Sequence, residues 1–298
     1  MKIAFVILNY NTYEETKEGI LSIEDKLDTK DYRIVIVDNC STDDSVEKIE
    51  KFIRDKEQIK LIRNSENLGF ARGNNIGIAY ANENYNPEFV VVCNSDIELM
   101  QYNLVARLDK EYQESGFALL GPLVLTGNNR YDTSPMAIPT ACQIKVQAED
   151  LKRSEILFKT GMYYPYRLLY YLKKRICPKS VKDNISDQSI NPCKYQKQVI
   201  INGCFMVFSK KFFDYFDGFD ERTFLFYEET ILYLKIMKTE LVTVYEPQIM
   251  VYHKGEAAFA SFLKTRRSEM LFKIKYKKKS AEVLLSEISE NEIVKGEN

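Results

Sequence analysis

Short apolar stretches alternate with polar, helix-forming stretches through roughly the first hundred residues of this chain, and few folds accommodate that order. Each apolar stretch is continuous and rich in β-branched residues, as in a strand that is buried on both faces. The four stretches are KIAFVIL (2–8), YRIVIVD (32–38), IKLIRN (59–64) and EFVVVCN (88–94). Between them, Thr12 with Glu15 and Ser41 with Asp44 match a capping box and predict helix starts. This alternation predicts an α/β fold with a mostly parallel central sheet flanked by helices.

The rest of the chain adds strands and divides into regions of different character. The further predicted elements are strands in FALLGPLVL (117–125), QVIINGCFMVF (198–208), LVTVYEP (241–247) and QIMVYH (248–253), and a helix near 228–238. Residues 126–198 lose periodicity, which indicates a variable insertion, and residues 261–298 form a basic and then acidic C-terminal extension. We therefore expect one domain over residues 1–260, consisting of residues 1–125, the insertion and residues 199–260.

Three of the predicted strands end in polar residues. These endings are Asn9-Tyr10-Asn11, Asp38-Asn39 and Asn94-Ser95-Asp96. In an open parallel sheet, ligands bind at the carboxyl ends of the strands, where loops present polar groups over a rigid scaffold. Turn and cap chemistry alone also places Asn and Asp at such points. Three such endings in one half of a fold favour a binding site.

Two common phosphate-binding motifs are absent from the sequence. No GxGxxG follows the first strand, which argues against a dinucleotide dehydrogenase, and no GxxxxGK[ST] is present, which argues against the usual NTPase. A phosphate site without a glycine-rich loop generally needs a metal cation. Asp96 is a hard carboxylate at the predicted mouth of the sheet, so we expect it to bind Mg²⁺ or Mn²⁺.

Charge and cysteine content limit the partners and the compartment. The net charge of −1 gives no reason to expect a polyanionic partner, so we predict no nucleic-acid binding. The six cysteines lack metal-site spacing and fit a reducing cytoplasm. The apolar run of MKIAFVILNYN is too short for a signal peptide, and no apolar stretch approaches the roughly 18 residues of a membrane span. We expect a cytoplasmic protein, soluble or peripheral on the inner face of the plasma membrane; the oligomeric state stays open.

Several longer motifs follow one another along the chain. They are VILNYN (6–11), VDNCSTDDS (37–45), NLGFARGNNIG (67–77), CNSDIEL (93–99), INGCFMVF (201–208) and GFDERTFLFYEE (218–229). In this order they resemble the motifs of the inverting family 2 glycosyltransferases with a GT-A (nucleotide-diphospho-sugar transferase) fold, particularly the bacterial rhamnosyltransferase-like branch. The resemblance covers roughly residues 1–125 and 198–255. The resemblance makes residues 1–125 the nucleotide-sugar-binding half and residues 199–260 the acceptor-side and catalytic half.

The resemblance also implies roles for individual residues. Asp96 becomes the metal ligand, joined by His253 of YHKG, although a hydrogen-bonded residue at a strand end is an equal interpretation of His253. Asp38 contacts the base or ribose of the donor. Glu229 becomes the general base, and Glu228 supports it through hydrogen bonds. The other implied donor-binding residues are Asn9, Asn11, Asn39, Asn67, Gly69, Arg72, Asn75, Asn94 and Ser95, and the acceptor-side residues are Asn202 and Gly203.

The implied activity is metal-dependent transfer of a hexosyl or deoxyhexosyl group, with inversion, from a nucleotide-diphosphate donor. The acceptor is a hydroxyl of a cell-surface glycan or a lipid-linked oligosaccharide, which places the enzyme in polysaccharide biosynthesis. The family pattern is altered at Asn94, Ser95 and Ile231, where the family has Asp, Pro and a second Asp, and Glu229 replaces an Asp. These departures leave open a binding scaffold with weak or no catalysis. A sugar nucleotidyltransferase is less favoured, because NYNTYEE is acidic and lacks glycine.

Two basic segments carry aromatic or apolar residues. Residues 159–179 interleave Lys and Arg with Tyr, and residues 264–279 read KTRRSEMLFKIKYKKK. Both fit an anionic membrane surface. Packing of the tyrosines in a core and a solvated helix face are the respective alternatives.

Overall fold

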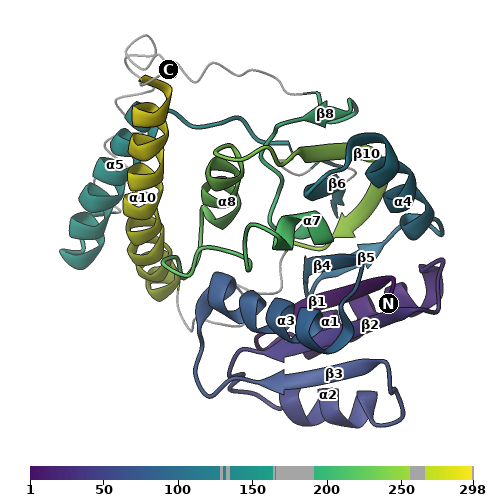
Figure 1. Ribbon diagram of the computed structural model, residues 1–298. Coiled ribbons are helices and arrows are strands. Elements are labelled where there is room, and N and C mark those ends of the chain that lie inside the picture. The colour runs from purple at the N-terminus through teal and green to yellow at the C-terminus, as the bar shows by residue number, and fades with distance from the viewer. Residues whose placement is uncertain (128–129, 132–134, 164, 166–190, 256–265, 297–298) are drawn as a thin grey trace.

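The structure is a computed structural model that describes residues 1–127, 130–131, 135–163, 165, 191–255 and 266–296. Figure 1 shows a central sheet with helices on both faces and two long helices side by side at one end of the molecule. Most of the basic segment 159–179, and residues 264–265, lie outside the described residues. Within the described part, no helix is both long enough and apolar enough to cross a membrane.

The sheet runs in the order β3-β2-β1-β4-β9-β6-β10-β5, with β7 beside β6 and β8 beside β10. Its strands are β1 (Ile3–Asn9), β2 (Tyr32–Asp38), β3 (Ile59–Arg63), β4 (Phe89–Asn94), β5 (Ile97–Leu99), β6 (Leu119–Thr126), β7 (Arg130–Tyr131), β8 (Gln196–Lys197), β9 (Phe205–Ser209) and β10 (Thr243–His253). The first four strands in this order are parallel, as predicted. Beyond β4 the sheet is mixed, because β9 runs antiparallel to both β4 and β6.

The direction of β9 brings its beginning to the carboxyl end of β4. Phe205 pairs with Cys93, and the backbone N–H of Asn94 donates to the carbonyl of Cys204 at 2.9 Å. The residues just before β9 therefore lie beside the polar residues that follow β4. A parallel β9 would have placed them at the opposite edge of the sheet.

Helices cover both faces of the sheet and one end of the molecule. They include α1 (Tyr13–Lys26), α2 (Ser45–Ile53), α3 (Gly69–Tyr85), α4 (Leu104–Ser115), α5 (Ala141–Lys159), α7 (Lys210–Phe213), α8 (Glu228–Ile236) and α10 (Arg266–Gly296). Side chains of α1, α2 and α4 pack on one face of the sheet, and those of α3, α7 and α8 pack on the other. Along β1, Ile3, Phe5 and Ile7 face the first set, whereas Ala4 and Val6 face the second. This double burial explains why the strand is apolar without alternation.

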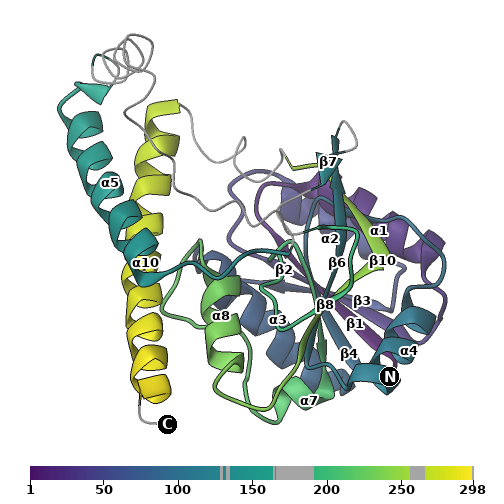
Figure 2. The same ribbon diagram turned by 90° about the horizontal axis from the view of Figure 1, so that it is seen from above.

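A third apolar cluster joins α5, α8 and α10. Its fully or nearly buried members are Ile144, Ala148, Ile231, Leu234, Ala281, Leu284 and Ile288. Figures 1 and 2 show α5 and α10 side by side, with α8 between them and the sheet. The described parts of the predicted insertion and of the predicted C-terminal extension are thus packed together against the central domain.

Two predicted boundaries are corrected. LVTVYEP and QIMVYH form one strand, β10, whose pairing with β6 shifts register between Glu246 and Met250. Pro247 lies in that irregularity and has no N–H to donate to the ladder, so the strand bulges there and continues. Of QVIINGCFMVF, only the part from Phe205 onward is the strand β9.

Candidate active site

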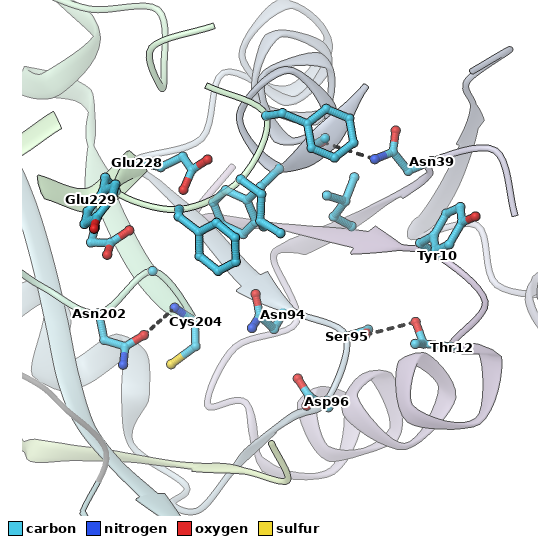
Figure 3. Close-up of a pocket in the computed structure, with 18 of the residues that line it drawn as sticks. Tyr10, Thr12, Asn39, Asn94, Ser95, Asp96, Asn202, Cys204, Glu228 and Glu229 are labelled. Atoms are coloured by element: carbon cyan, nitrogen blue, oxygen red, sulfur yellow. Dashed lines mark hydrogen bonds between the residues drawn. The ribbon is translucent and has the colours of Figure 1, made fainter. Parts of the chain in front are cut away.

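A cavity of about 530 Å³ opens at the carboxyl ends of β1 and β4, beside the start of β9 and the N-terminus of α8 (Figure 3). Eleven of the sixteen residues to which the sequence assigned site roles line it: Asn39, Asn67, Gly69, Asn94, Ser95, Asp96, Asn202, Gly203, Glu228, Glu229 and His253. The cavity volume is in the range of small-molecule and cofactor sites. Segments that are far apart in the chain therefore meet at one concave surface.

Asp96 lies in the turn that joins β4 to β5, and its side chain faces that of His253 at the end of β10. The Oδ1 atom of Asp96 lies 3.3 Å from Nε2 of His253, and its Oδ2 atom accepts a hydrogen bond from the N–H of Gly255 at 3.1 Å. Burial opposes ionisation of Asp96, but the hydrogen bonds from His253 and Gly255 outweigh it and lower the pKa of that carboxyl. Antiparallel pairing of His253 with Ile97 holds the two side chains together.

This pair fits a divalent cation. Asp96 offers a hard carboxylate oxygen and His253 an imidazole nitrogen, which suits Mn²⁺ through both groups and Mg²⁺ through the carboxylate. Among the described residues, no three His, Cys, Asp or Glu side chains gather closely enough to hold a metal by themselves. The remaining ligands would therefore be phosphate oxygens and water, as is usual for Mg²⁺ at nucleotide sites.

The two glutamates begin α8, directly after a strained piece of backbone. Phe226 and Tyr227 both have positive φ, at 77° and 66°, which non-glycine residues rarely adopt. Glu228 is buried, and its Oε1 atom meets no hydrogen-bond donor in the part of the chain that the structure describes. Burial, followed by the charge of Glu229, raises the pKa of Glu228 to about 8. Burial also raises the pKa of Glu229, against its backbone N–H and the charge of Lys277.

Asn39 holds the loop that precedes α3. Its Nδ2 donates to Asn67 Oδ1 at 3.0 Å and to the carbonyl of Gly69 at 3.1 Å, and its Oδ1 accepts from the N–H of Leu68 at 3.0 Å. Gly69 has a φ of 80°, and an added Cβ would lie 2.3 Å from the carbonyl oxygen of Phe224. This glycine therefore allows the loop to approach the segment that leads to the two glutamates.

Asn9 and Asp38 lie below the cavity rather than in its wall. Asn9 is fully buried and donates from Nδ2 to Asp38 Oδ1 at 2.8 Å. Asp38 also accepts from Ser41, through its N–H at 3.0 Å and its hydroxyl at 2.5 Å.

These bonds correct the predicted capping boxes. Ser41 is engaged with Asp38, and α2 begins only at Ser45. Thr12 is the N-cap residue of α1, as predicted, but its hydroxyl bonds to Asn9 Oδ1 at 3.1 Å and to Ser95 Oγ at 3.0 Å instead of to the helix backbone.

Three further residues predicted on the donor side lie outside the cavity lining. Asn75 binds the backbone of Phe219 through both amide atoms, at 2.8 Å and 2.9 Å, and so fastens α3 to the loop before α8. Asn11 exchanges hydrogen bonds with Thr42 at 2.7 Å and 3.2 Å. Arg72 is exposed on α3. The contacts of Asn75 and Asn11 are those of residues that hold neighbouring segments in place.

Sequence reasoning did not predict the contribution of α10. Phe272 and Lys277 of this helix line the cavity together with Phe224 and Tyr227. Phe224 stacks on Tyr276 with ring centroids 4.1 Å apart. The spacing of Phe272 and Tyr276, four residues apart, could have indicated an aromatic helix face, but nothing in the sequence shows which surface that face covers.

Known proteins resemble this chain in sequence and in fold. The sequence model of the family described as Glycosyl transferase family 2 matches residues 4–215. A stretch of 123 residues, 41% of this chain, is 26% identical to the low-salt glycan biosynthesis hexosyltransferase Agl10 of Haloferax volcanii, and it covers 36% of that protein. The match thus spans about a third of the length of this curated relative.

Solved structures match over nearly the whole chain. One is S. aureus TarS 1–349 in complex with UDP-GlcNAc, with a TM-score of 0.53 and 16% identity over 98% of this chain and 72% of that one. Another is GalNAc-T7 with UDP, GalNAc and Mn²⁺, with a TM-score of 0.57 and 14% identity over 92% of this chain and 47% of that one. At such identities the likeness concerns the fold alone, and it confirms the predicted GT-A fold.

Proposed function

This chain belongs to glycosyl transferase family 2, and on that premise we propose that it is an inverting, metal-dependent glycosyltransferase. It moves a hexosyl or deoxyhexosyl group from a nucleotide-diphosphate donor to a hydroxyl of a glycan or a lipid-linked oligosaccharide. One observation carries the proposal. The Asp96–His253 pair and the Glu228–Glu229 pair line one cavity from different sides (Figure 3), as an in-line displacement with separate leaving-group and base sites requires.

The transfer is a single displacement at the anomeric carbon. Glu229 accepts the proton of the acceptor hydroxyl, and the hydroxyl oxygen forms a bond to the anomeric carbon. The bond between that carbon and the diphosphate oxygen breaks at the same time, and the diphosphate leaves with both electrons of that bond. Glu228 stays protonated near neutral pH and supports its neighbour, because its pKa is about 8. A cation held by Asp96 and His253 would neutralise the charge that the leaving diphosphate develops.

On the donor side, Asn39, Asn67 and Gly69 form the wall nearest to β2, and Asn94 and Ser95 lie beside the proposed metal ligands. We propose that residues 1–125 bind the nucleotide sugar and that residues 199–260, with α10, bind the acceptor. We propose that Asp38 contacts the base or ribose of the donor; in the free protein its carboxylate accepts hydrogen bonds from Asn9 and Ser41. Asn202 and Gly203 lie near Glu229 on the acceptor side, with Glu229 Oε2 3.6 Å from the Cβ position of Gly203.

We further propose the bacterial rhamnosyltransferase-like branch, polysaccharide biosynthesis and a cytoplasmic location on an anionic membrane surface. Two cations of the basic segment are already paired, because Lys273 binds Glu269 at 2.5 Å and Lys278 binds Glu155 at 2.6 Å. Lys275 and Lys279 are exposed on α10 and support the membrane contact.

The test is turnover of a panel of nucleotide sugars, beginning with UDP-GlcNAc, with Mn²⁺, with Mg²⁺ and with a chelator. Hydrolysis or transfer that needs a divalent ion, and that Asp96→Ala abolishes, is the expected result. Asp109→Ala is the matched control, because Asp109 pairs with Lys2 away from the cavity. Binding without turnover would favour the scaffold, and formation of a nucleotide sugar from a nucleoside triphosphate and a sugar phosphate would favour the nucleotidyltransferase.

A further inference from the structure

Lys277 is the one Lys or Arg among the described residues that line the cavity. It comes from α10, a helix of the C-terminal segment, whereas the two glutamates begin α8. Its ammonium group lies 5.7 Å from the centre of the Tyr227 ring, immediately before those glutamates. A positive charge from a distant part of the chain is thus placed beside the acidic pair.

Two neighbouring lysines of α10 form ion pairs with other residues. Lys273 pairs with Glu269 on the same helix, and Lys278 pairs with Glu155 of α5. Within the described residues, by contrast, no carboxylate lies within ion-pair distance of Lys277. The carboxylate whose charge it opposes through space is Glu229. The charge of Lys277 is therefore not neutralised by an ion pair that holds the helix in place.

The rest of α10 is held firmly, so the position of Lys277 is defined. Ser280, three residues after Lys277, donates its hydroxyl to the carbonyl of Leu225 at 2.8 Å. Glu287 is buried and pairs with Arg222 and with Lys238, the latter at 3.2 Å. These bonds tie the helix to the loop that leads into Glu228 and Glu229 and to the end of α8.

Few charged or titratable groups surround Glu229. Glu228 and Tyr227 adjoin it in the chain, Lys277 of α10 lines the same cavity, and the other titratable residues of the lining are Tyr10, Asp96, Cys204 and His253. Glu228 carries no charge near neutral pH, and burial favours a neutral Glu229 as well. A general base must be ionised, and a nearby cation is the usual way to keep a buried carboxylate ionised.

We propose that Lys277 is a positioning residue for the reaction: its ammonium group, on the wall of the same cavity, keeps the Glu229 carboxylate ionised. Its catalytic consequence rests on the proposed function. The electrostatic relation between Lys277 and Glu229 does not, since it belongs to the free protein. The two can therefore be tested separately.

The first measurement is the titration of Glu229 in the free protein, by NMR of ¹³C-labelled glutamate side chains with the signal assigned by Glu229→Gln. In Lys277→Met the midpoint should rise by about one pH unit, and in Lys277→Arg it should stay near that of the natural protein. Lys279→Met is the matched control, because Lys279 is exposed on the same helix. An unchanged midpoint in Lys277→Met, or an equal rise in Lys279→Met, would overturn the proposal.

The second measurement is the pH profile of nucleotide-sugar hydrolysis by the same variants. The acidic limb should move upward in Lys277→Met and return in Lys277→Arg, whereas a merely structural role would lower the rate at every pH. A rise in the titration midpoint without turnover of any nucleotide sugar would refute the proposed function and leave the role of Lys277 standing. Thermal unfolding checks each variant, and Lys277→Gln replaces Lys277→Met if the latter does not fold.

Discussion

Glu228 and Glu229 are adjacent in the sequence, yet their surroundings differ. Both line the cavity from the first turn of α8, directly after the positive φ angles of Phe226 and Tyr227. Glu228 is buried, and one of its oxygens has no hydrogen-bond donor among the described residues. Glu229 is partly open to the cavity, and the positive charge of Lys277 lowers its pKa against the effect of burial. The environment thus suits Glu228 to carry a proton and Glu229 to accept one.

Glu229→Gln should lower kcat by about 10²-fold or more, the scale of a lost general base, with donor affinity nearly unchanged. The amide keeps the size of the side chain but cannot accept a proton, and the proposed donor contacts lie on other segments. Steady-state kinetics and calorimetric titration with the donor measure the two quantities. Glu228→Gln is the control and should cost less. If Glu228→Gln were inactive and Glu229→Gln nearly normal, the roles would be reversed.

Glu228 should also make stability depend on pH. The unfolded chain ionises this group near its ordinary pKa of 4.5, whereas the folded protein holds the proton up to about pH 8. Between these values the folded state binds more protons, so the free energy of unfolding falls as pH rises, by at most about 1.4 kcal/mol per pH unit. Urea unfolding from about pH 5 to about pH 9 should show this decline in the natural protein. Glu228→Gln should flatten it, and an identical decline in that variant would assign it to another group.

At the scale of the elements, the third apolar cluster, which joins α5, α8 and α10, accounts for one departure from the family pattern. Ile231 occupies a position where the family resemblance leads one to expect an Asp, and it is fully buried against Ile144, Ala281 and Leu284. A carboxylate there would be enclosed by apolar side chains. The isoleucine is therefore a packing residue that lets α10 cover this side of α8.

Ile231→Asp should destabilise the protein by about 3 kcal/mol or more, because it removes a buried side chain and encloses a polar group without a partner. It should not raise activity. Ile231→Val is the control and should cost about 1 kcal/mol. Urea unfolding measures both changes. Higher turnover in a stable Ile231→Asp variant would show instead that the position belongs to the reaction.

At the scale of the whole molecule, the C-terminal segment completes the site. Phe272 and Lys277 of α10 line the cavity, and Ala281, Leu284 and Ile288 cover apolar side chains of α5 and α8. The helix is therefore part of the folded unit over its described length, and an appended membrane tail would not account for these contacts.

Removal of residues 266–298 should lower the thermal unfolding temperature and abolish turnover together, because it uncovers the third apolar cluster and removes one wall of the cavity. Calorimetry and a turnover assay on the truncated chain measure the two effects. A stable truncated protein with normal turnover would contradict the packing of α10.

Membrane contact therefore calls for a gentler change than truncation. Replacing both Lys275 and Lys279 by Glu should weaken binding to vesicles that contain anionic lipid, by about 1 kcal/mol or more of binding free energy for each lost lysine charge. Cosedimentation with the vesicles measures the binding. High salt should have the same effect on the natural protein. Unfolding temperature and turnover in solution should be unchanged. Equal sedimentation of the variant at low salt would rule out this surface.

The sequence by itself determined the α/β class, the first four parallel strands and the location of the candidate site at the carboxyl ends of strands. These properties follow from local patterns: a strand buried on both faces must be apolar throughout, and polar residues that end neighbouring parallel strands must meet at one edge. The motif order around Asp96 and Glu229 indicated the family for the same reason, since each motif is a short stretch that can be recognised alone.

Only the tertiary structure decided which of the polar residues reach the cavity. Asn9 of β1 bonds to Asp38 and Ser41, which lie 29 and 32 residues further along the chain, and none of the three lines the cavity. The antiparallel course of β9 and the position of Lys277 depend on contacts between segments that are distant in the chain. Such contacts are set by packing and by competition for hydrogen bonds, and no local pattern encodes them.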